Sequence, residues 1–339
     1  TLYPLCTDSD TMTDCLQGEG LERMRREIAE RVGDARGDGS RVAGLGMYTS
    51  ILTNNCQSIE LPGIALTSGN ALTIGMGIEA IRRSCAERGI ELAQATAAVV
   101  GAAGNIASTY AGLLSEQVGR LWLLGSGREG SPRRLARTAA RIHAEAARAL
   151  HAGRDADDLL ARRIGAVPGV RDLVDAHIDS ADLGERVFAH LEATLGEHNF
   201  VRVAVDTACL REAQVVVCAA NAPRAFLGAD DFAPQAVVCD IAVPLNVDQD
   251  LPAQRPDIAY LHGGIVRTPM GDGLPPHVRA YLGEGELYAC MAESVLMGLS
   301  GMREHYSYGD IDRDQVRRML ALAHAHGFGL GGIKTANSL

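Results

Sequence analysis

The fold of this chain can be inferred outward from ATAAVVGAAGNIA, residues 95–107. The first six residues are small or β-branched and lead into Gly101, which predicts a buried strand followed by a tight turn. The turn passes directly into Asn105 and an apolar helical pattern. The segment therefore has the strand, glycine turn and helix order of a dinucleotide-binding unit. A purely structural strand-to-helix turn is the alternative interpretation.

Short apolar segments alternate with helical ones on both sides of this unit. Further strands are expected at 41–46, 63–68, 121–125, 201–205, 214–220, 236–243 and 257–263. Helices are expected at 20–33, 70–88, 105–118, 130–164, 286–300 and 312–326. This alternation predicts an α/β fold, a Rossmann-type doubly wound parallel sheet. We expect an N-terminal α/β substrate region at 1–95, a nucleotide-binding domain at 96–265, and a C-terminal helical cap at 266–339.

The glycine turn and the end of the second strand predict the cofactor. Glycines at 101 and 104 let backbone N–H groups approach a pyrophosphate at the helix N-terminus. The second strand ends in LGSGR, residues 124–128, where an NAD site usually has an acidic residue at the strand end. A hydroxyl and a guanidinium suit a 2′-phosphate instead, so we expect NADPH; a solvated loop charge is the alternative for the arginine. Ala220 and Pro244, where two later strands end, are added to this set. The predicted cofactor-binding residues are Gly101, Ala103, Gly104, Asn105, Ile106, Ser126, Arg128, Ala220 and Pro244.

Composition excludes several classes of function. A net charge of −10 disfavours nonspecific nucleic-acid binding. The eight cysteines are scattered without a CxxC pair, which predicts a reduced, cytoplasmic protein and no zinc or other metal site. No apolar run is long enough to span a bilayer, and TLYPLCTDSD at the start lacks a signal-peptide pattern. The single lysine, Lys334, leaves no candidate for Schiff-base chemistry in the core.

A cysteine at the start of a predicted helix is the candidate nucleophile. The segment YACMAE, residues 288–293, places Cys290 near the N-terminus of the 286–300 helix. The thiolate is the competent nucleophile, and a helix N-terminus lowers the pKa of a thiol. Small alanine neighbours leave room for a substrate. Burial for packing is the alternative, as we expect for the cysteines in or beside strands, Cys209, Cys218 and Cys239.

Six motifs together resemble the aldehyde-forming long-chain acyl-ACP reductases of the cyanobacterial type (ACP, acyl carrier protein). Their order and approximate spacing match the family from about residue 40 to 330. The motifs are GLGMYTS at 44–50, TSGNALT at 67–73, the turn at 101–107, LHGGIV at 261–266, YACMAE at 288–293 and HGF at 326–328.

The resemblance implies that NADPH reduces an acyl thioester to an aldehyde in two steps. Cys290 would take the acyl group from a carrier protein or from CoA, and hydride transfer to the bound thioester would then be intramolecular. Ser68, Asn70 and the backbone of Gly263-Gly264 are candidate oxyanion donors. For Ser68 and Asn70, capping of the helix that starts at 70 is an equally open interpretation.

Two further residues are candidates for proton transfer. His262 precedes the Gly-Gly pair, where the family often has lysine, and Glu293 lies on the helix face of Cys290. For His262 a hydrogen-bonded strand-end histidine is the slightly preferred interpretation, and for Glu293 the alternative is pairing with an arginine.

The chain departs from the long-chain enzymes in two ways. Aromatic residues make up only 4% of the chain, which favours an acyl group smaller or more polar than a long fatty tail. An Arg/Ala-rich stretch at 128–163 supplies a basic surface on which an acidic carrier protein could dock. An ordinary solvated helix face is the alternative. The arginines concerned are Arg133, Arg134, Arg137, Arg141 and Arg148.

Two other functions remain open. One is a non-covalent NADP-dependent dehydrogenase resembling the shikimate or glutamyl-tRNA reductase group, supported by the segment CDIAVPLNV at 239–247. The other is a non-catalytic domain of a larger synthase, which the non-Met start admits. Replacement of Cys290 by alanine distinguishes the covalent reductase from the dehydrogenase.

Overall fold

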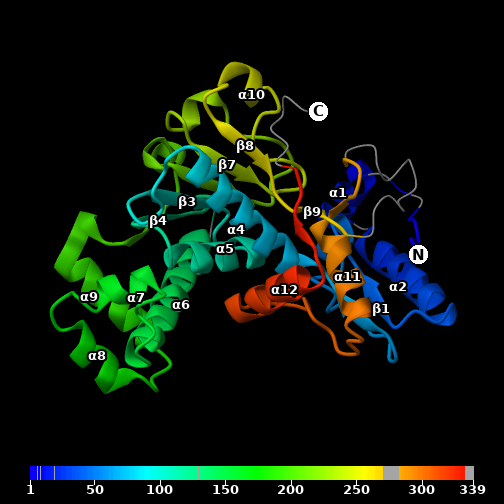
Figure 1. Cartoon of the computed structure of the whole chain (residues 1–339), viewed down its shortest axis with the longest axis horizontal. Helices are drawn as coiled ribbons and strands as arrows, with labels where there is room; N and C mark the ends of the chain where they lie inside the picture. Colours follow the sequence, from blue (N-terminus) through cyan, green and yellow to red (C-terminus); the bar gives the residue numbers. More distant parts are fainter. Residues whose placement is uncertain (6, 8, 19, 129, 270–281, 333–339) are drawn as a thin grey trace. The chain divides into compact units, whose positions relative to one another are not determined.

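The structure is a computed structural model that describes all residues except 6, 8, 19, 129, 270–281 and 333–339 (Figure 1). The chain divides into two compact units. One comprises Thr1–Gly77 together with the segment that begins at Gly263, and the other comprises Ile78–His262. Residues 1–77 of the expected N-terminal region and the described part of the expected C-terminal region therefore belong to the same unit, whereas residues 78–95 belong to the other.

A six-stranded parallel sheet forms the centre of the Ile78–His262 unit. Its strand order is β5-β4-β3-β6-β7-β8, so the order reverses between β3 and β6. This is the strand order of a Rossmann fold, and the expected Rossmann-type α/β architecture is confirmed. The strands are β3 (Thr96–Val100), β4 (Arg120–Leu124), β5 (Val201–Ala204), β6 (Val215–Cys218), β7 (Val237–Asp240) and β8 (Ala259–His262).

The two faces of this sheet are covered differently. Successive side chains of a strand point to opposite faces of the sheet. Helix α5 (Asn105–Ser115) packs on β3 and β4, and helix α6 (Ser131–His151) packs on β4 and β5. On the opposite face, alternate residues of the strands pack against the short connections in the second half of the sheet, and together they form a hydrophobic core. Those connections contain η2 (Thr207–Glu212), η3 (Ala229–Asp231) and α10 (Leu251–Gln254).

A group of four helices separates β4 from β5, where we expected one helical stretch. Besides α6 the helices are α7 (Leu159–Ile164), α8 (Val170–His177) and α9 (Leu183–Leu195), and η1 (Gly196–His198) follows. The Asp158 side chain accepts the Ala161 N–H at 2.9 Å and so begins α7 as a separate helix. A Cβ on Gly184 would lie 1.9 Å from the Ala140 carbonyl oxygen, so α6 and α9 meet at backbone distance.

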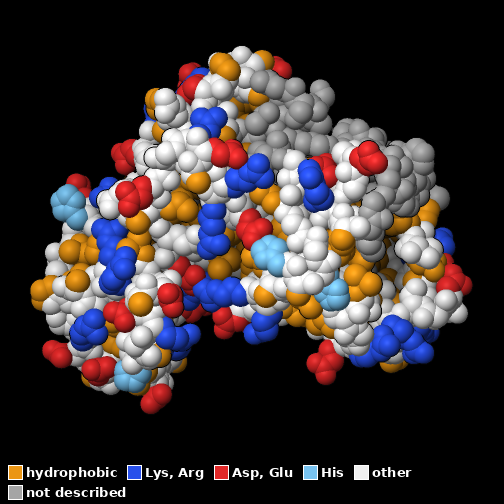
Figure 2. All heavy atoms as spheres, in the orientation of Figure 1, with side chains coloured by type: hydrophobic (Ala, Val, Ile, Leu, Met, Phe, Trp, Pro, Cys, Tyr) orange, Lys and Arg blue, Asp and Glu red, His pale blue; other side chains and the backbone are white. Residues whose placement is uncertain are grey.

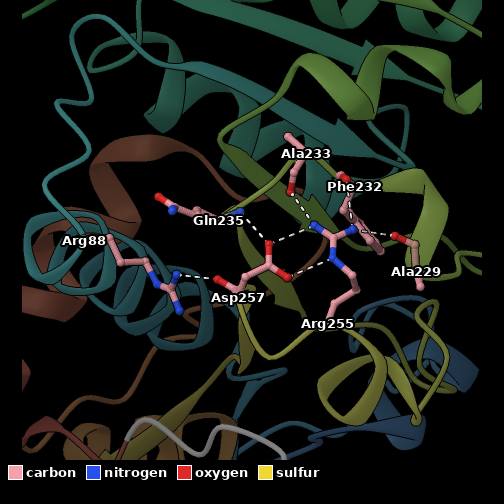
Figure 3. A network of polar contacts seen from close by, with 7 residues as sticks. All are labelled: Arg88, Ala229, Phe232, Ala233, Gln235, Arg255 and Asp257. Carbon is pink, nitrogen blue, oxygen red and sulfur yellow. Dashed lines mark hydrogen bonds and ion pairs between the residues drawn. The ribbon is translucent and has the colours of Figure 1, made fainter.

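An arginine–aspartate cluster fixes the amino end of β8 (Figure 3). The Arg255 guanidinium donates to both Asp257 carboxylate oxygens, at 2.8 and 2.9 Å, and to the Ala229 carbonyl at 2.8 Å. Arg88 donates to the Asp257 carbonyl oxygen at 2.6 Å. The Arg255 side chain holds the pKa of the Asp257 carboxyl well below its usual range. These contacts lie at the amino edge of the parallel sheet, opposite the carboxyl ends of the strands, and they are structural.

In its described residues, the other unit contains two small sheets and five helices of its own. A parallel pair joins β1 (Val42–Gly44) to β2 (Ala65–Thr67), and an antiparallel sheet has the order β10-β9-β11. Residues 286–288, expected at the start of a helix, form β10 because they pair with β9. The remaining elements are α1 (Ser9–Gln17), α2 (Leu21–Gly37), α3 (Tyr48–Leu52), β9 (Ile265–Arg267), β10 (Glu286–Tyr288), α11 (Ala289–Leu299), α12 (Arg313–Ala325) and β11 (Gly329–Leu330), and α4 (Asn70–Glu87) runs across the boundary between the units.

Among the described residues, no helix combines the length and apolar character needed to cross a bilayer. The same part of the chain contains no group of three or more His, Cys, Asp and Glu side chains placed to hold a metal ion.

Candidate functional site

The glycine turn between β3 and α5 has the geometry of a phosphate-binding turn. Gly101 has a φ of +79°, which favours glycine, and Gly104 is the N-cap of α5. A Cβ on Gly101 would lie 2.6 Å from the Ala220 Cα, so the turn packs against the backbone that follows β6. Gly101 and Ala220 therefore meet where the strand order reverses, the position at which open α/β sheets bind ligands. Ala103, Asn105 and Ile106 lie in this turn and the first turn of α5.

The other predicted cofactor residues lie at the same edge of the sheet. Ser126 and Arg128 are exposed in the loop after β4, and Pro244 lies in the loop after β7. His262 is the last residue of β8, where its ring makes an edge contact with Tyr260. All four residues follow or end parallel strands, so the topology places them at the carboxyl edge.

A buried polar network that the sequence analysis did not predict supports this edge. The Asn246 side chain donates to the Ala220 carbonyl at 2.9 Å and accepts the Ala220 N–H at 2.8 Å. Asp240 accepts the N–H groups of Ala242, Asn246 and Val247 at 2.8–3.0 Å. Burial raises the pKa of the Asp240 carboxyl to about 6, although these N–H donors lower it. The only sequence signal was the segment 239–247, noted for another reason.

Cys290 lies in the first turn of α11 and contacts two glycines of distant segments. A Cβ on Gly46 would lie 2.7 Å from the Cys290 sulfur, and one on Gly69 would lie 2.2 Å from the Cys290 Cα. Gly69 also has a φ of +75°, so glycine is needed there for two reasons. The GLGMYTS, TSGNALT and YACMAE motifs therefore converge on Cys290 within one unit. Cys290 is a partly exposed residue, whereas the other described cysteines are buried.

The Cys290 thiol is less acidic than its helix position suggests. Burial raises its pKa to about 11, and the Glu293 carboxylate adds to the rise. The backbone N–H groups of Met47 and Met291 are directed at the sulfur and act in the opposite direction. Met47 is a non-glycine residue with a φ of +54°, a strained conformation of the kind found at functional sites. The expected lowering of the thiol pKa is therefore outweighed by desolvation.

Glu293 is fully buried and joins α11 to the turn before α4. It accepts hydrogen bonds from Thr67 Oγ1 and from the Leu72 N–H, the latter at 2.8 Å, and from Ser307. Burial raises the pKa of the Glu293 carboxyl, and these donors lower it. The carboxyl thus pairs with hydroxyl and backbone donors, and its role in proton transfer stays a prediction. Glu293 positions the Gly69 turn against Cys290.

Ser68 and Asn70 flank Gly69, but they do not cap α4. Other side chains accept the N–H groups at the start of this helix. The Gly69 N–H donates to the Thr67 hydroxyl, the Ala71 N–H to the Ser307 hydroxyl, and the Leu72 N–H to the Glu293 carboxylate. The capping interpretation is therefore wrong. Asn70 donates to the Asn55 side chain at 3.2 Å. The Ser68 hydroxyl is buried and has no hydrogen-bond partner within the described part of the chain.

Comparisons with known proteins include a distant relative and a weak structural match. No protein-family model matches the chain. It is 26% identical over 328 residues to the protein named aminotransferase PigE of Serratia sp. (strain ATCC 39006), covering 91% of this chain and 32% of that protein. The chain thus spans about a third of the length of this relative. A dipicolinate synthase chain from Bacillus halodurans matches with a TM-score of 0.34 and 14% identity, over 65% of this chain and 56% of that chain.

Proposed function

We propose that this chain is an NADPH-dependent reductase that converts an acyl thioester to an aldehyde through an acyl-Cys290 intermediate. The observation that carries the proposal is the surroundings of Cys290. Cys290 is a partly exposed residue whose sulfur packs against Gly46, and the N–H groups of Met47 and Met291 point at this sulfur. Backbone donors of this kind stabilise a thiolate or a developing oxyanion.

The chemistry balances without a metal. The Cys290 sulfur attacks the thioester carbonyl, the bond to the donor sulfur breaks, and the thiol proton passes to the departing thiolate. NADPH, when bound at the glycine turn of the Rossmann domain, supplies the hydride that reduces acyl-Cys290 to a hemithioacetal. Collapse of the hemithioacetal releases the aldehyde and, with one proton taken up, restores the Cys290 thiol.

Ser68 is our candidate donor to the oxyanion. Its hydroxyl is buried beside Gly69 and has no partner within the described residues. A buried polar atom without a partner is costly, and an incoming carbonyl oxygen would remove that cost. Asn70, whose amide already binds Asn55, is the less direct candidate.

The preference for NADPH over NADH rests on the loop after β4. Ser126 and Arg128 are exposed there, at the carboxyl end of the second strand of the Rossmann order. A guanidinium and a hydroxyl at this position suit the 2′-phosphate of NADP.

An acidic carrier protein is the proposed acyl donor, with CoA as the second candidate. The five arginines of α6 are all exposed, and Glu145 is the one acidic residue of this helix. In the face shown in Figure 2, basic side chains gather over the region of α6–α9, with acidic side chains among them. A basic face on a chain of net charge −10 supplies local complementarity to an acidic partner.

The relative's name suggests what consumes the aldehyde. An aminotransferase acts on a carbonyl compound, and the chain matches only 32% of that protein. Pyridoxal phosphate chemistry needs a lysine for the Schiff base, and this chain has one lysine, Lys334. We therefore assign the aldehyde-forming step to this segment and amination of the aldehyde to a separate aminotransferase domain or partner.

A non-covalent dehydrogenase is the second candidate, favoured by the loop that Asp240 organises after β7. Steady-state consumption of NADPH with acyl-carrier and acyl-CoA thioesters separates the two. Cys290→Ala should lower thioester reduction at least about a thousandfold while leaving NADPH binding intact. Turnover that survives the substitution would contradict the covalent mechanism and favour the dehydrogenase.

A further inference from the structure

The Asn246 carboxamide binds both backbone polar groups of a single residue, Ala220. It donates to the Ala220 carbonyl at 2.9 Å and accepts the Ala220 N–H at 2.8 Å. Asn246 is fully buried, so both hydrogen bonds form away from water. Only a side chain with one donor and one acceptor can make this pair, which explains an amide at this position.

Ala220 is the backbone on which the phosphate-binding turn rests. A Cβ on Gly101 would lie 2.6 Å from the Ala220 Cα and 2.8 Å from the Ala219 carbonyl oxygen. The position of Ala220 therefore fixes how closely the turn after β3 approaches the loop after β6. These two loops border the reversal of strand order, where a dinucleotide binds in this fold.

Asp240 in turn fixes Asn246. Its carboxylate accepts the Asn246 N–H at 2.8 Å and the Val247 N–H at 2.9 Å, and Asp240 is the last residue of β7. The Asn246 carbonyl also accepts the N–H groups of Phe226 and Leu227, at 2.9 and 3.1 Å. Asn246 is thus held through its backbone on two sides while its side chain reaches Ala220.

We infer that Asn246 is a positioning residue for the dinucleotide: through Ala220 it sets the gap between the turn after β3 and the loop after β6. The inference rests only on the cofactor-binding part of the proposed function and holds for a covalent or a non-covalent reductase. The residue acts through backbone geometry and contributes no group to the reaction.

The test is the affinity of the whole chain for NADPH, measured by calorimetry for wild type and Asn246→Asp. The substitution keeps size and shape but replaces the Nδ2 donor by an oxygen that faces the Ala220 carbonyl. We expect the dissociation constant for NADPH to rise at least about tenfold. Turnover at saturating NADPH should change much less, which gives a split between KM and kcat.

Asn199→Asp is the matched control. Asn199 is a fully buried asparagine of the same unit, just before β5, and its side chain donates to Glu192. This variant should lose thermal stability but bind NADPH with wild-type affinity. Asn246→Ala removes both hydrogen bonds without placing two oxygens against each other, and it should also weaken NADPH binding. It replaces Asn246→Asp in the test if that variant fails to fold.

Three outcomes would overturn the inference. Wild-type affinity in the Asn246 variants would contradict it alone, and so would an equal loss of affinity in Asn199→Asp. Failure of the wild-type chain to bind NADPH would overturn both the inference and the proposed function. Turnover surviving Cys290→Ala would overturn the covalent mechanism and leave the role of Asn246 standing.

Discussion

At the scale of the residue, Cys290 shows how two opposing effects determine the state of a thiol. Two backbone N–H groups and a helix start favour the thiolate, whereas burial and the nearby Glu293 carboxylate favour the thiol. Burial wins, so the pKa lies near 11 and the resting group is protonated. The N–H donors are nevertheless in place for negative charge that develops when a substrate is attacked.

The first prediction concerns the pH dependence of Cys290 alkylation. Because the thiolate is the reactive species and its pKa is raised to about 11, the rate with iodoacetamide should rise about tenfold per pH unit from pH 7 to about pH 10. Peptide mapping by mass spectrometry would follow the modification, with Cys290→Ser as the unreactive control. A plateau below pH 8 would show a low thiol pKa and contradict the assignment.

Some residues of the site could be predicted from sequence, and others could not. Gly101 and Cys290 stand in local patterns, a strand followed by a glycine turn and a cysteine at a helix start. Glu293 and Thr67 are 226 residues apart, so only the fold brings them together. Asn246 has no periodicity or spacing that marks it as a partner of Ala220. The raised pKa of Cys290 depends on burial, which no local pattern gives.

At the scale of the element, α6 carries two unlike faces. Its exposed face bears five arginines, and its buried face packs on α9 with His143 fully buried. The His143 ring lies 5.1 Å from the ring of Phe188 and binds the Ala139 carbonyl. Burial lowers the pKa of His143 to about 4. One face of α6 thus packs against α9, and the other face forms a charged surface.

The second prediction is an acid-sensitive contact between α6 and α9. Between pH 6.5 and pH 4 the unfolded chain binds a proton on His143 that the folded chain does not, since the pKa falls from 6.5 to about 4 on folding. The free energy of unfolding should therefore decrease as pH falls through this range, by at most about 3 kcal/mol from this group. Urea unfolding at pH 7 and pH 5 would measure it. His143→Leu should reduce the pH dependence, and an unchanged slope would contradict the assignment.

The third prediction tests the arginine face of α6. Arg137→Glu combined with Arg141→Glu should raise KM for an acyl-carrier substrate at least about tenfold at low salt and weaken its salt dependence. A truncated acyl-pantetheine thioester without phosphate should be reduced at an unchanged rate. Arg23→Glu with Arg26→Glu on α2 changes the same charge at exposed positions elsewhere and serves as the control. Equal effects of the two double variants would exclude a dedicated docking face.

At the scale of the whole molecule, the sequence predicts the Rossmann sheet better than the rest. Its strands are short apolar runs separated by turns, so local pattern finds all six of them near their true ends. The three-residue β10 was expected as helix, because its strand character depends on pairing with β9. The joining of Thr1–Gly77 with the segment from Gly263 is a contact between distant parts of the chain, which periodicity does not encode.

Intact-protein mass spectrometry after incubation with an acyl thioester, in the absence of NADPH, tests the central claim most directly. We predict an acyl adduct on the wild-type chain and none on Cys290→Ala, and we expect added NADPH to discharge the adduct as an aldehyde. Aldehyde formation without any adduct, or an adduct of equal yield on Cys290→Ala, would contradict covalent reduction through Cys290.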